Sequence, residues 1–269
     1  HLIITINSHL SSAYNTNNDH RLAKFNVLAL FKILKFAYQY ADEIVAISEG
    51  VADDLARITK ILKKQIRIFY LPVLTDRFYK LKSQSIENPS LFAKDVPNIL
   101  SVGRLTAAKD FATLIRAFSI VVKYVPSRLV ILGEGELKNE LIKLSQKLKI
   151  SNAVYFLGNV NNVFEYISKS ICVISTSLWE DPGFVMIETA FVKKIIISSD
   201  CPNGPKEFIE NNKAGYIFEN NNCDNLINQI NLFLKDSSNN IYLKKVAAIK
   251  KSKKYTLFNH YHSLKKILN

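Results

Sequence analysis

Cysteine is scarce in this chain of 269 residues, and the few that occur show no metal-binding spacing. The three cysteines, Cys172, Cys201 and Cys223, are odd in number and form no CxxC pair. This usage argues against a disulfide scaffold and a zinc site, and it is typical of a reducing compartment. We therefore predict a cytoplasmic protein, and we place Cys172 in the core because it lies in an apolar run.

Long hydrophobic runs are also missing. No apolar stretch reaches the roughly 20 residues that a membrane-spanning helix needs. The best candidate, residues 25–40, is interrupted by Lys32 and Lys35. The first residues have neither the basic region nor the cleavage site of a signal peptide. They also lack an initiating Met and have the pattern of a strand already under way, so we expect either that the natural protein begins upstream of His1 or that the reading frame is clipped.

Apolar residues and positive charge, by contrast, are plentiful. Apolar residues make up 48% of the chain, which predicts a folded core in one large domain or two small ones. The 36 Lys and Arg residues outnumber 23 Asp and Glu, for a formal net charge of +13. That excess suits a nucleotide diphosphate, a nucleic acid or an acidic membrane surface, and charge alone does not choose among them. A codon bias towards Lys, Asn and Ile is a further explanation of the charge.

Short β-branched runs alternate with amphipathic patterns, which predicts βα units around parallel sheets. The first series predicts strands at residues 2–6, 43–47 and 65–70. Its helices are expected at 22–40 and 49–59, the second capped by Ser48. The stretch 72–97 carries Pro72, Pro89 and Pro97 and is the best linker in the chain.

A second series follows with six or seven strands, enough for a complete doubly wound domain. Its strands are predicted at 98–102, 129–132, 154–156, 171–175, 195–198 and 216–218. The intervening helices are predicted at 110–124, 136–148, 163–168, 183–191, 206–210 and 224–234, and residues 241–268 as a helical tail. We therefore predict an α/β fold with a partial domain and linker at 1–90, a complete domain at 91–240 and a tail at 241–269 that packs back towards the first. The strands that the first series lacks should lie before His1.

Two cations border the first strand of the second series. Gly103 and Arg104 follow that strand directly, and Lys109 precedes a helix. Ligands of doubly wound sheets gather at the carboxyl ends of strands, and glycine lets the backbone approach a phosphate closely. Both cations could thus reach a diphosphate from one loop. Taken alone the motif is weak, and a solvated loop explains it equally well.

Two carboxylates, Glu180 and Glu188, stand with seven residues between them. The sequence predicts that Glu180 lies in a loop after a strand, that Pro182 occupies the first helical turn, and that Glu188 lies more than one turn into the helix. A carboxylate accepts two hydroxyl hydrogen bonds at once, so Glu180 could bind a sugar and Glu188 a ribose. An ordinary acidic loop followed by a surface Glu is the less favoured alternative.

The start of the same helix is a natural anion site, because its first N–H groups have no partner within the helix. The residues that would present them are Gly183, Phe184 and Val185.

The motifs together resemble the retaining GT-B glycosyltransferases of family 4, a large group that includes many bacterial lipopolysaccharide and capsule enzymes. The resemblance covers nearly the whole chain from about Ala41 to Leu268 and is specific as a combination. It rests on these segments: Ala41-Asp-Glu-Ile-Val-Ala-Ile-Ser-Glu-Gly-Val-Ala-Asp-Asp-Leu, Ser101-Val-Gly-Arg-Leu…Lys109-Asp, Leu132-Gly-Glu-Gly, Phe156-Leu-Gly, Glu180…Glu188-Thr-Ala and Ser199-Asp-Cys-Pro-Asn-Gly-Pro-Lys-Glu207.

The resemblance implies a GT-B-like fold, with a Rossmann-like donor domain at 91–240 and part of a Rossmann-like acceptor domain at 1–90. It implies transfer of a sugar from a nucleotide diphosphate sugar to a glycan or lipid-linked acceptor of the cell envelope, with retention of configuration. Arg104 and Lys109 would hold the donor diphosphate, Glu180 the donor sugar and Glu188 the ribose.

Backbone groups complete the implied donor site. Those of Gly103 and of residues 183–185 would touch phosphate or sugar, and the turn from Gly133 to Gly135 would lie near the base. Family members need no metal or other cofactor beyond the nucleotide sugar itself. The sequence agrees with this, since it shows no DxD-like pair and no histidine cluster at ligand spacing.

Three departures from the family pattern occur. Asp181-Pro182 follows the first Glu where Gly-Phe is more frequent, and Leu71 stands where an Asn is frequent. The Gly-rich loop that opens the family's acceptor domain has no counterpart, so we expect a truncated chain. A family histidine near the sugar could correspond to His9, whereas Asn7 or an ordinary loop histidine are the alternatives.

Other readings remain open at this point. The chain could be an inactive remnant or a donor-binding half that needs a partner, and the charge of +13 leaves a nucleic-acid binder as a lower-ranked alternative. The basic helix at 22–40 could lie on the inner face of an acidic membrane, although packing on its own sheet is favoured. The base, the sugar and the acceptor are not disclosed by the sequence.

Overall fold

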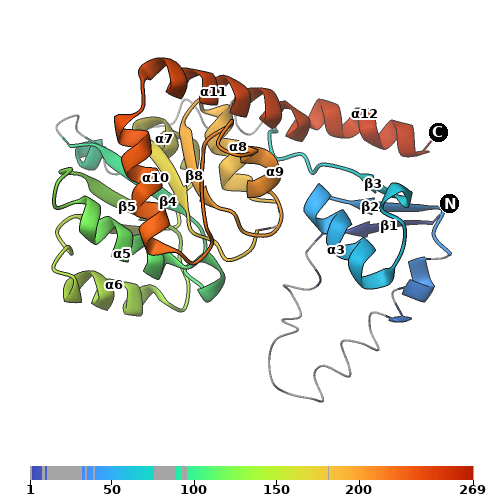
Figure 1. Ribbon diagram of the computed structural model, residues 1–269, viewed down its shortest axis with the longest axis horizontal. Coiled ribbons are helices and arrows are strands. Elements are labelled where there is room, and N and C mark those ends of the chain that lie inside the picture. The colour runs from blue at the N-terminus through green and yellow to red at the C-terminus, as the bar shows by residue number, and fades with distance from the viewer. Residues whose placement is uncertain are drawn as a thin grey trace.

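The computed structural model describes residues 2–7, 10, 32–33, 35–38, 40–75, 89–92, 96–180 and 182–268. The described residues form two modules, each built around a parallel sheet (Figure 1). The large module has six strands in the order β6-β5-β4-β7-β8-β9, and the small module has three in the order β1-β2-β3. The predicted α/β class with parallel sheets is confirmed.

The observed strands lie close to their predicted ranges. They are β1 (Ile3–Ile6), β2 (Glu43–Ala46), β3 (Ile66–Ile68), β4 (Asn98–Val102), β5 (Arg128–Leu132), β6 (Val154–Gly158), β7 (Cys172–Ser175), β8 (Ile195–Ser199) and β9 (Tyr216–Phe218). The helices of the two modules are α3 (Glu49–Thr59), α5 (Phe111–Val121), α6 (Lys138–Lys147), α7 (Val163–Lys169), α8 (Phe184–Phe191), α9 (Pro205–Ile209) and α10 (Cys223–Lys235).

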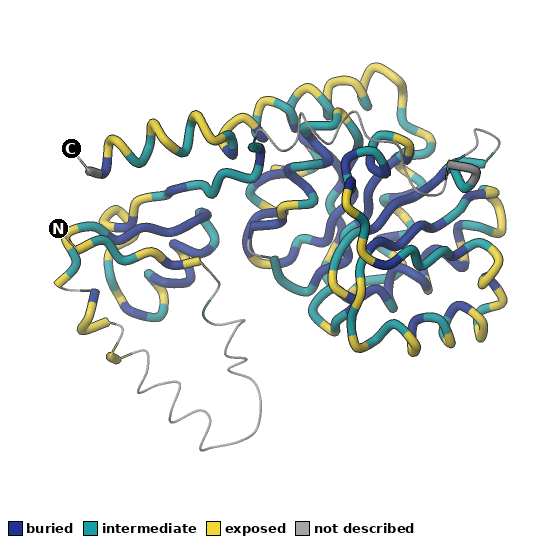
Figure 2. Tube along the Cα trace, turned by 180° about the vertical axis from the view of Figure 1, so that it is seen from behind, coloured by how far each residue is buried: buried dark blue, intermediate teal, exposed yellow. Residues whose placement is uncertain are grey.

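Helices cover both faces of the large sheet, so its strands are buried on both sides (Figure 2). Successive residues of β4 show this, because Ile99 packs with α5 and α10 while Leu100 packs with α7 and α8. A strand buried on both faces has a continuous apolar sequence, and this explains why the strands could be predicted from β-branched runs. Cys172 is fully buried in β7, as expected.

The small sheet is also covered on both faces. Helix α3 packs on one face, where Val51 and Leu55 join a buried cluster with Ile44. Ser48 caps this helix, because its hydroxyl accepts a hydrogen bond from the N–H of Val51 at 3.2 Å. The predicted helix at 22–40 lies largely outside the described residues, although residues 32–33 and 35–38 of it are helical.

The tail consists of two helices, α11 (Ser238–Ser252) and α12 (Leu257–Leu268), separated by a 3-10 turn at Lys253–Tyr255. Helix α11 packs on the large module, where Ala248 is buried. Helix α12 extends beyond it to the second face of the small sheet, where Ile267 packs with Val45 and Phe69 (Figure 1). The tail is broken at Thr256, which takes an extended conformation and bridges to Leu74.

Candidate functional site

The strand order of the large sheet reverses direction between β4 and β7. Strand β4 pairs in parallel with β5 on one side and with β7 on the other, so the connections after β4 and β7 leave the same edge of the sheet in opposite directions. Ligands of doubly wound sheets bind outside the carboxyl ends of the strands at such a point. The loop that carries Gly103, Arg104 and Lys109 follows β4, and the loop that carries Glu180 follows β7. The fold therefore brings the two predicted motifs to one place.

An ion pair joins these two loops. Lys109 Nζ lies 2.7 Å from Glu180 Oε1, and the two side chains are only 24% and 14% exposed. Pairs that are half-buried are less screened by solvent than surface pairs. The stem of Lys109 runs beside the backbone of Gly103, where an added Cβ would lie 3.5 Å from Lys109 Cγ. Lys109 is thus held over the end of β4 and points at Glu180.

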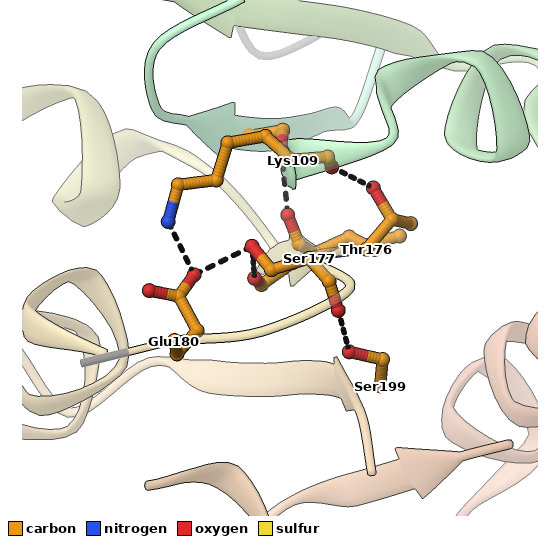
Figure 3. A network of polar contacts seen from close by, with 8 residues as sticks. Lys109, Thr176, Ser177, Glu180 and Ser199 are labelled. Atoms are coloured by element: carbon orange, nitrogen blue, oxygen red, sulfur yellow. Dashed lines mark hydrogen bonds and ion pairs between the residues drawn. The ribbon is translucent and has the colours of Figure 1, made fainter. Parts of the chain in front are cut away.

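Hydroxyl groups hold the loop after β7 in place (Figure 3). Ser177 donates a hydrogen bond of 2.5 Å to the same Oε1 of Glu180 that receives Lys109. Thr176 donates to the carbonyl oxygen of Lys109 at 2.9 Å, and Ser199 donates to the carbonyl oxygen of Ser177 at 2.6 Å. Sequence reasoning missed these hydroxyls. The run of Ser and Thr directly after β7 was the signal that could have indicated them.

Only one oxygen of Glu180 is engaged. Oε1 receives both Lys109 and Ser177, whereas Oε2 has no hydrogen-bond partner among the described residues. A carboxylate oxygen accepts hydrogen bonds but cannot donate one when ionised. The geometry therefore leaves one acceptor atom of Glu180 for a ligand, and we expect hydroxyl groups to be its partners.

Replacing Ser177 by alanine tests whether its hydrogen bond to Glu180 matters for activity. In Ser177→Ala, the carboxylate of Glu180 loses one of its two protein partners, and we expect turnover to fall by roughly 10-fold or more, because a hydrogen bond to a charged group contributes about 1.5 kcal/mol or more. Steady-state kinetics check this. Ser168→Ala serves as control, because Ser168 donates to the carbonyl oxygen of Glu165 on α7 instead. Equal rates for both variants would contradict the role.

The turn after β5 packs tightly against the end of β4. Gly133 has a φ of 130°, and a Cβ there would lie 2.0 Å from the carbonyl oxygen of Gly103. No side chain fits such an approach, so glycine is required at this position. A Cβ on Gly135 would lie 2.5 Å from the carbonyl oxygen of Leu105. A cavity of about 310 Å³ adjoins the turn, lined by Val102, Gly103, Arg104, Leu132, Gly133, Asn159, Val160 and Val163.

Arg104 lies at the mouth of this cavity and is exposed. Within the described ranges its side chain forms no ion pair or hydrogen bond, in contrast to that of Lys109. Its guanidinium is therefore available to an anion that enters from solvent. Arginine binds phosphate through two parallel N–H bonds, which makes it suited to a diphosphate.

The start of α8 differs from the prediction by one residue. Gly183 is the N-cap with a φ of 85°, and the helix begins at Phe184. Pro182 therefore precedes the cap and does not occupy the first helical turn, and this part of the prediction was wrong. The backbone at Gly183 lies beside Glu180, because an added Cβ would be 3.9 Å from Glu180 Cβ. The first N–H groups of α8, at Phe184 and Val185, have no helical partners.

Glu188 lies one turn into α8 and is largely enclosed. Burial raises the pKa of its carboxyl to about 7 from an ordinary value of 4.5. No cation or hydrogen-bond donor of the described residues contacts the carboxyl. An unpaired, enclosed acid is destabilising in its ionised form, and such groups cluster at functional sites.

The structure thus brings together Gly103, Lys109, Glu180 and Gly183, with the Gly133 turn and Arg104 at the adjacent cavity. Glu188 forms no hydrogen bond or ion pair with Lys109 or Arg104, although it lies on the helix that starts beside Glu180. His9 lies outside the described residues. In the described part of the chain, no group of three or more His, Cys, Asp or Glu residues could hold a metal ion.

Comparison with known proteins identifies the family of this chain. Residues 82–254 match the model of glycosyl transferases group 1. The chain belongs to this family. The match spans the large module, with the Lys109–Glu180 pair, the Gly133 turn and α8 all inside it.

Two relatives and one solved structure show the extent of the likeness. An uncharacterized glycosyltransferase of Methanocaldococcus jannaschii is 35% identical over 178 residues, which cover 65% of this chain and 44% of that protein. The N-acetylgalactosamine-N,N'-diacetylbacillosaminyl-diphospho-undecaprenol 4-alpha-N-acetylgalactosaminyltransferase of Campylobacter jejuni is 30% identical over 212 residues, or 79% of this chain and 56% of that protein. The chain thus spans about half the length of these relatives.

Anabaena HepE, whose crystal structure holds UDP and glucose, superposes with a TM-score of 0.78 at 17% identity, covering 99% of this chain and 71% of that one. At this identity the likeness shows the fold alone, and the predicted GT-B-like arrangement is confirmed. No helix in the described ranges is long and apolar enough to cross a membrane.

Proposed function

We propose that this group 1 glycosyltransferase is a retaining enzyme of family 4 that moves a sugar from a nucleoside diphosphate sugar to a glycan or lipid-linked acceptor. The observation that carries the proposal is the Lys109–Glu180 pair between the ends of β4 and β7, with one oxygen of Glu180 left for a ligand. A cation, a carboxylate and the start of a helix lie together there. The first and third can bind the diphosphate of an activated sugar, and the carboxylate can bind its hydroxyl groups.

The donor spans the site from sugar to base. Glu180 accepts hydrogen bonds from sugar hydroxyls, and Lys109 and Arg104 neutralise the diphosphate. The N–H groups at the start of α8 add a second source of positive potential. Glu188 receives the ribose hydroxyls, and the Gly133 turn with its cavity holds the base. This division assigns residues 91–240 to the donor and residues 1–90 to the acceptor, with the tail at 241–269 joining them.

The reaction breaks the bond between the anomeric carbon and the diphosphate oxygen and forms a bond from that carbon to an acceptor oxygen. Negative charge develops on the leaving diphosphate, and fixed cations at that position lower the barrier. Lys109 and Arg104 supply this charge without a metal in our proposal. His9, which lies outside the described residues, remains a proposed group beside the sugar.

Two parts of the proposal, retention of configuration and the class of acceptor, are argued by analogy with the relatives. The Campylobacter jejuni relative is named for an alpha linkage and for a diphospho-undecaprenol substrate. Common nucleoside diphosphate hexoses carry an α-configured anomeric carbon, so an α-linked product means retention. By analogy we propose an envelope glycan or lipid-linked acceptor, a cytoplasmic enzyme that meets the inner face of the membrane, and no nucleic-acid partner.

Thermal unfolding with nucleotides tests the donor site and identifies the base. UDP, GDP and ADP, each alone and as sugar conjugates, are added with and without EDTA. A ligand at 100 times its Kd stabilises by about 2.7 kcal/mol, so we expect one base to raise the Tm by about 5 °C or more. EDTA should leave that rise unchanged. If no nucleotide shifts the Tm, the donor site is refuted, and a shift that needs a divalent metal refutes metal independence.

A further inference from the structure

One carboxylate of the large module reaches across to the small module. Glu207, on α9, accepts a hydrogen bond from the backbone N–H of Glu49 through Oε2 at 3.0 Å. Its Oε1 accepts from the hydroxyl of Tyr70 at 2.5 Å. Both oxygens of one side chain are thus engaged by two different segments of the small module, one after β2 and one after β3. We call this set of contacts the Glu207 clasp.

The first contact lies at the N-terminus of α3, where a negative charge is stabilised by the helix dipole. Ser48 already caps the helix through the N–H of Val51, so Glu207 satisfies a second N–H from outside the module. The backbones also approach closely at this point. A Cβ on Gly50 would lie 2.5 Å from Asn203 Oδ1 and 3.1 Å from Asn203 Cα. Only glycine permits α3 to dock against this segment.

The second contact is fixed by aromatic packing. The ring of Tyr70 lies 4.9 Å, centroid to centroid, from that of Tyr255. Tyr255 is only 2% exposed and packs in the core of the large module with Phe208. Lys251 of α11 donates to the backbone carbonyl oxygen of Glu207 at 3.1 Å. The backbone of Glu207 is therefore tied to α11, while its carboxylate binds the small module.

The segment that carries the clasp also contacts the sugar end of the proposed donor site. The N–H of Glu180 donates to the carbonyl oxygen of Pro202 at 3.3 Å, five residues before Glu207. A cavity of about 390 Å³ lies between the modules at the same place, with Cys201, Lys206 and Glu207 on one wall and Glu49, Asp53 and Arg57 on the other. Movement at the clasp would therefore change both the cavity and the position of the small module relative to Glu180.

We propose that Glu207 is a positioning residue that holds the small module against the loop of Glu180 during glycosyl transfer. The proposal rests on the proposed function, because it assigns the acceptor to the small module and the donor to the large one. A displacement of about 1 Å between reacting groups can reduce a rate by roughly 100-fold. The Glu207 clasp would fix the distance between the acceptor on the small module and the donor on the large module, and its loss would leave the donor site itself intact.

Two variants at this position separate positioning from simple stability. Glu207→Ala removes both contacts. Glu207→Gln keeps them, because its amide oxygen accepts from the N–H of Glu49 and its amide nitrogen donates to the hydroxyl oxygen of Tyr70. We expect Glu207→Ala to lower turnover by about 10-fold or more and to raise the KM for the acceptor, and we expect Glu207→Gln to recover most of the rate. The Kd for the nucleotide that shifts the Tm should stay within about twofold in both.

Hydrogen exchange gives a readout that does not depend on activity. The amide of Glu49 should exchange faster in Glu207→Ala and at the wild-type rate in Glu207→Gln, because only the first leaves it unpaired. Tyr70→Phe removes the other contact with little change in packing and leaves the N–H of Glu49 bonded to Oε2. Its turnover and acceptor KM, which should change in the same direction as in Glu207→Ala, provide a second test if Glu207→Ala fails to fold. Glu219→Ala is the matched control, since this exposed carboxylate bonds to Asn222 within the large module.

The outcomes are distinct. Faster exchange in Glu207→Ala with unchanged turnover and acceptor KM overturns the positioning role, and so do wild-type turnover and acceptor KM in Tyr70→Phe. Unchanged exchange of the Glu49 amide in Glu207→Ala overturns the clasp itself. A parallel loss of nucleotide affinity means that Glu207 supports the donor site, which also overturns the proposal. Absence of transfer by the wild-type protein with every donor contradicts the proposed function, whereas the exchange rates still decide whether the clasp exists.

Discussion

The Lys109→Ala variant should lose turnover by about 100- to 1,000-fold while its fold remains intact, because fixed charges at a developing anion are worth this much in other active sites. The substitution removes the cation proposed to face the leaving diphosphate. It also leaves Glu180 Oε1 with Ser177 as its only partner among the residues that the structure describes. The loss should appear in kcat and not only in donor affinity, since the charge on the leaving group is largest in the transition state.

Lys213→Ala provides the control for Lys109→Ala. Lys213 pairs with Glu210 at 3.0 Å on the surface of the large module, where both side chains are well exposed. Exposed ion pairs contribute little to the stability of a protein, so we expect Lys213→Ala to keep wild-type turnover. Single-turnover kinetics with saturating donor measure the chemical step in both variants. A Lys109→Ala rate within threefold of wild type would remove Lys109 from the proposed reaction.

Much of the fold could be predicted because local patterns determine it. The helix at 49–59 was predicted with its observed bounds, since Ser48 is a strong N-cap signal. The prediction that Pro182 occupies the first helical turn was wrong, and the reason is also local. Gly183 takes a positive φ and is the N-cap, so the helix begins two residues after the proline. The sequence could not distinguish a proline at the first helical position from one just before a glycine cap.

The contacts within the candidate site depend on the sheet and could not be predicted in detail. Lys109 and Glu180 are separated by 71 positions and meet only because β4 pairs with β7. The pattern indicated that both loops leave the same edge, but not that one oxygen of Glu180 would be occupied by Lys109 and Ser177. The reach of Glu207 to Tyr70 and Glu49 was likewise unpredictable, because it depends on how two modules dock.

The Glu188→Gln variant should be more stable than the wild-type protein at neutral and higher pH, even though it loses donor affinity. Burial raises the pKa of Glu188 to about 7 in the folded protein, above the ordinary 4.5 of an unfolded chain. Between these values the folded state binds more protons than the unfolded state, so stability falls as pH rises through this window. Above pH 7 the ionised carboxylate costs about 3 kcal/mol, and glutamine avoids this cost at nearly the same size.

Chemical denaturation at several pH values measures the difference. At pH 4 the two proteins should be about equally stable, because Glu188 is then protonated in both states. At pH 8 the variant should be more stable by about 3 kcal/mol. Glu140→Gln, at an exposed position of α6, is the control and should show no such pH-dependent gain. A variant that is less stable at pH 8 would show that Glu188 has a stabilising partner within the protein.

The same substitution should weaken the donor by about 10-fold, because an amide offers one acceptor oxygen in place of two to the ribose hydroxyls. Hydroxyl donors favour the ionised carboxylate, so donor binding should lower the pKa of Glu188 in the wild-type protein. Affinity for a nucleoside diphosphate sugar should therefore rise between pH 6 and pH 8, whereas Glu188→Gln should bind with little pH dependence. Calorimetric titration at these pH values measures the affinity of both proteins for the donor. If the affinity of the wild-type protein does not depend on pH, Glu188 does not bind the ribose. Greater stability with weaker binding is the result expected of a carboxylate kept buried and unpaired for a ligand.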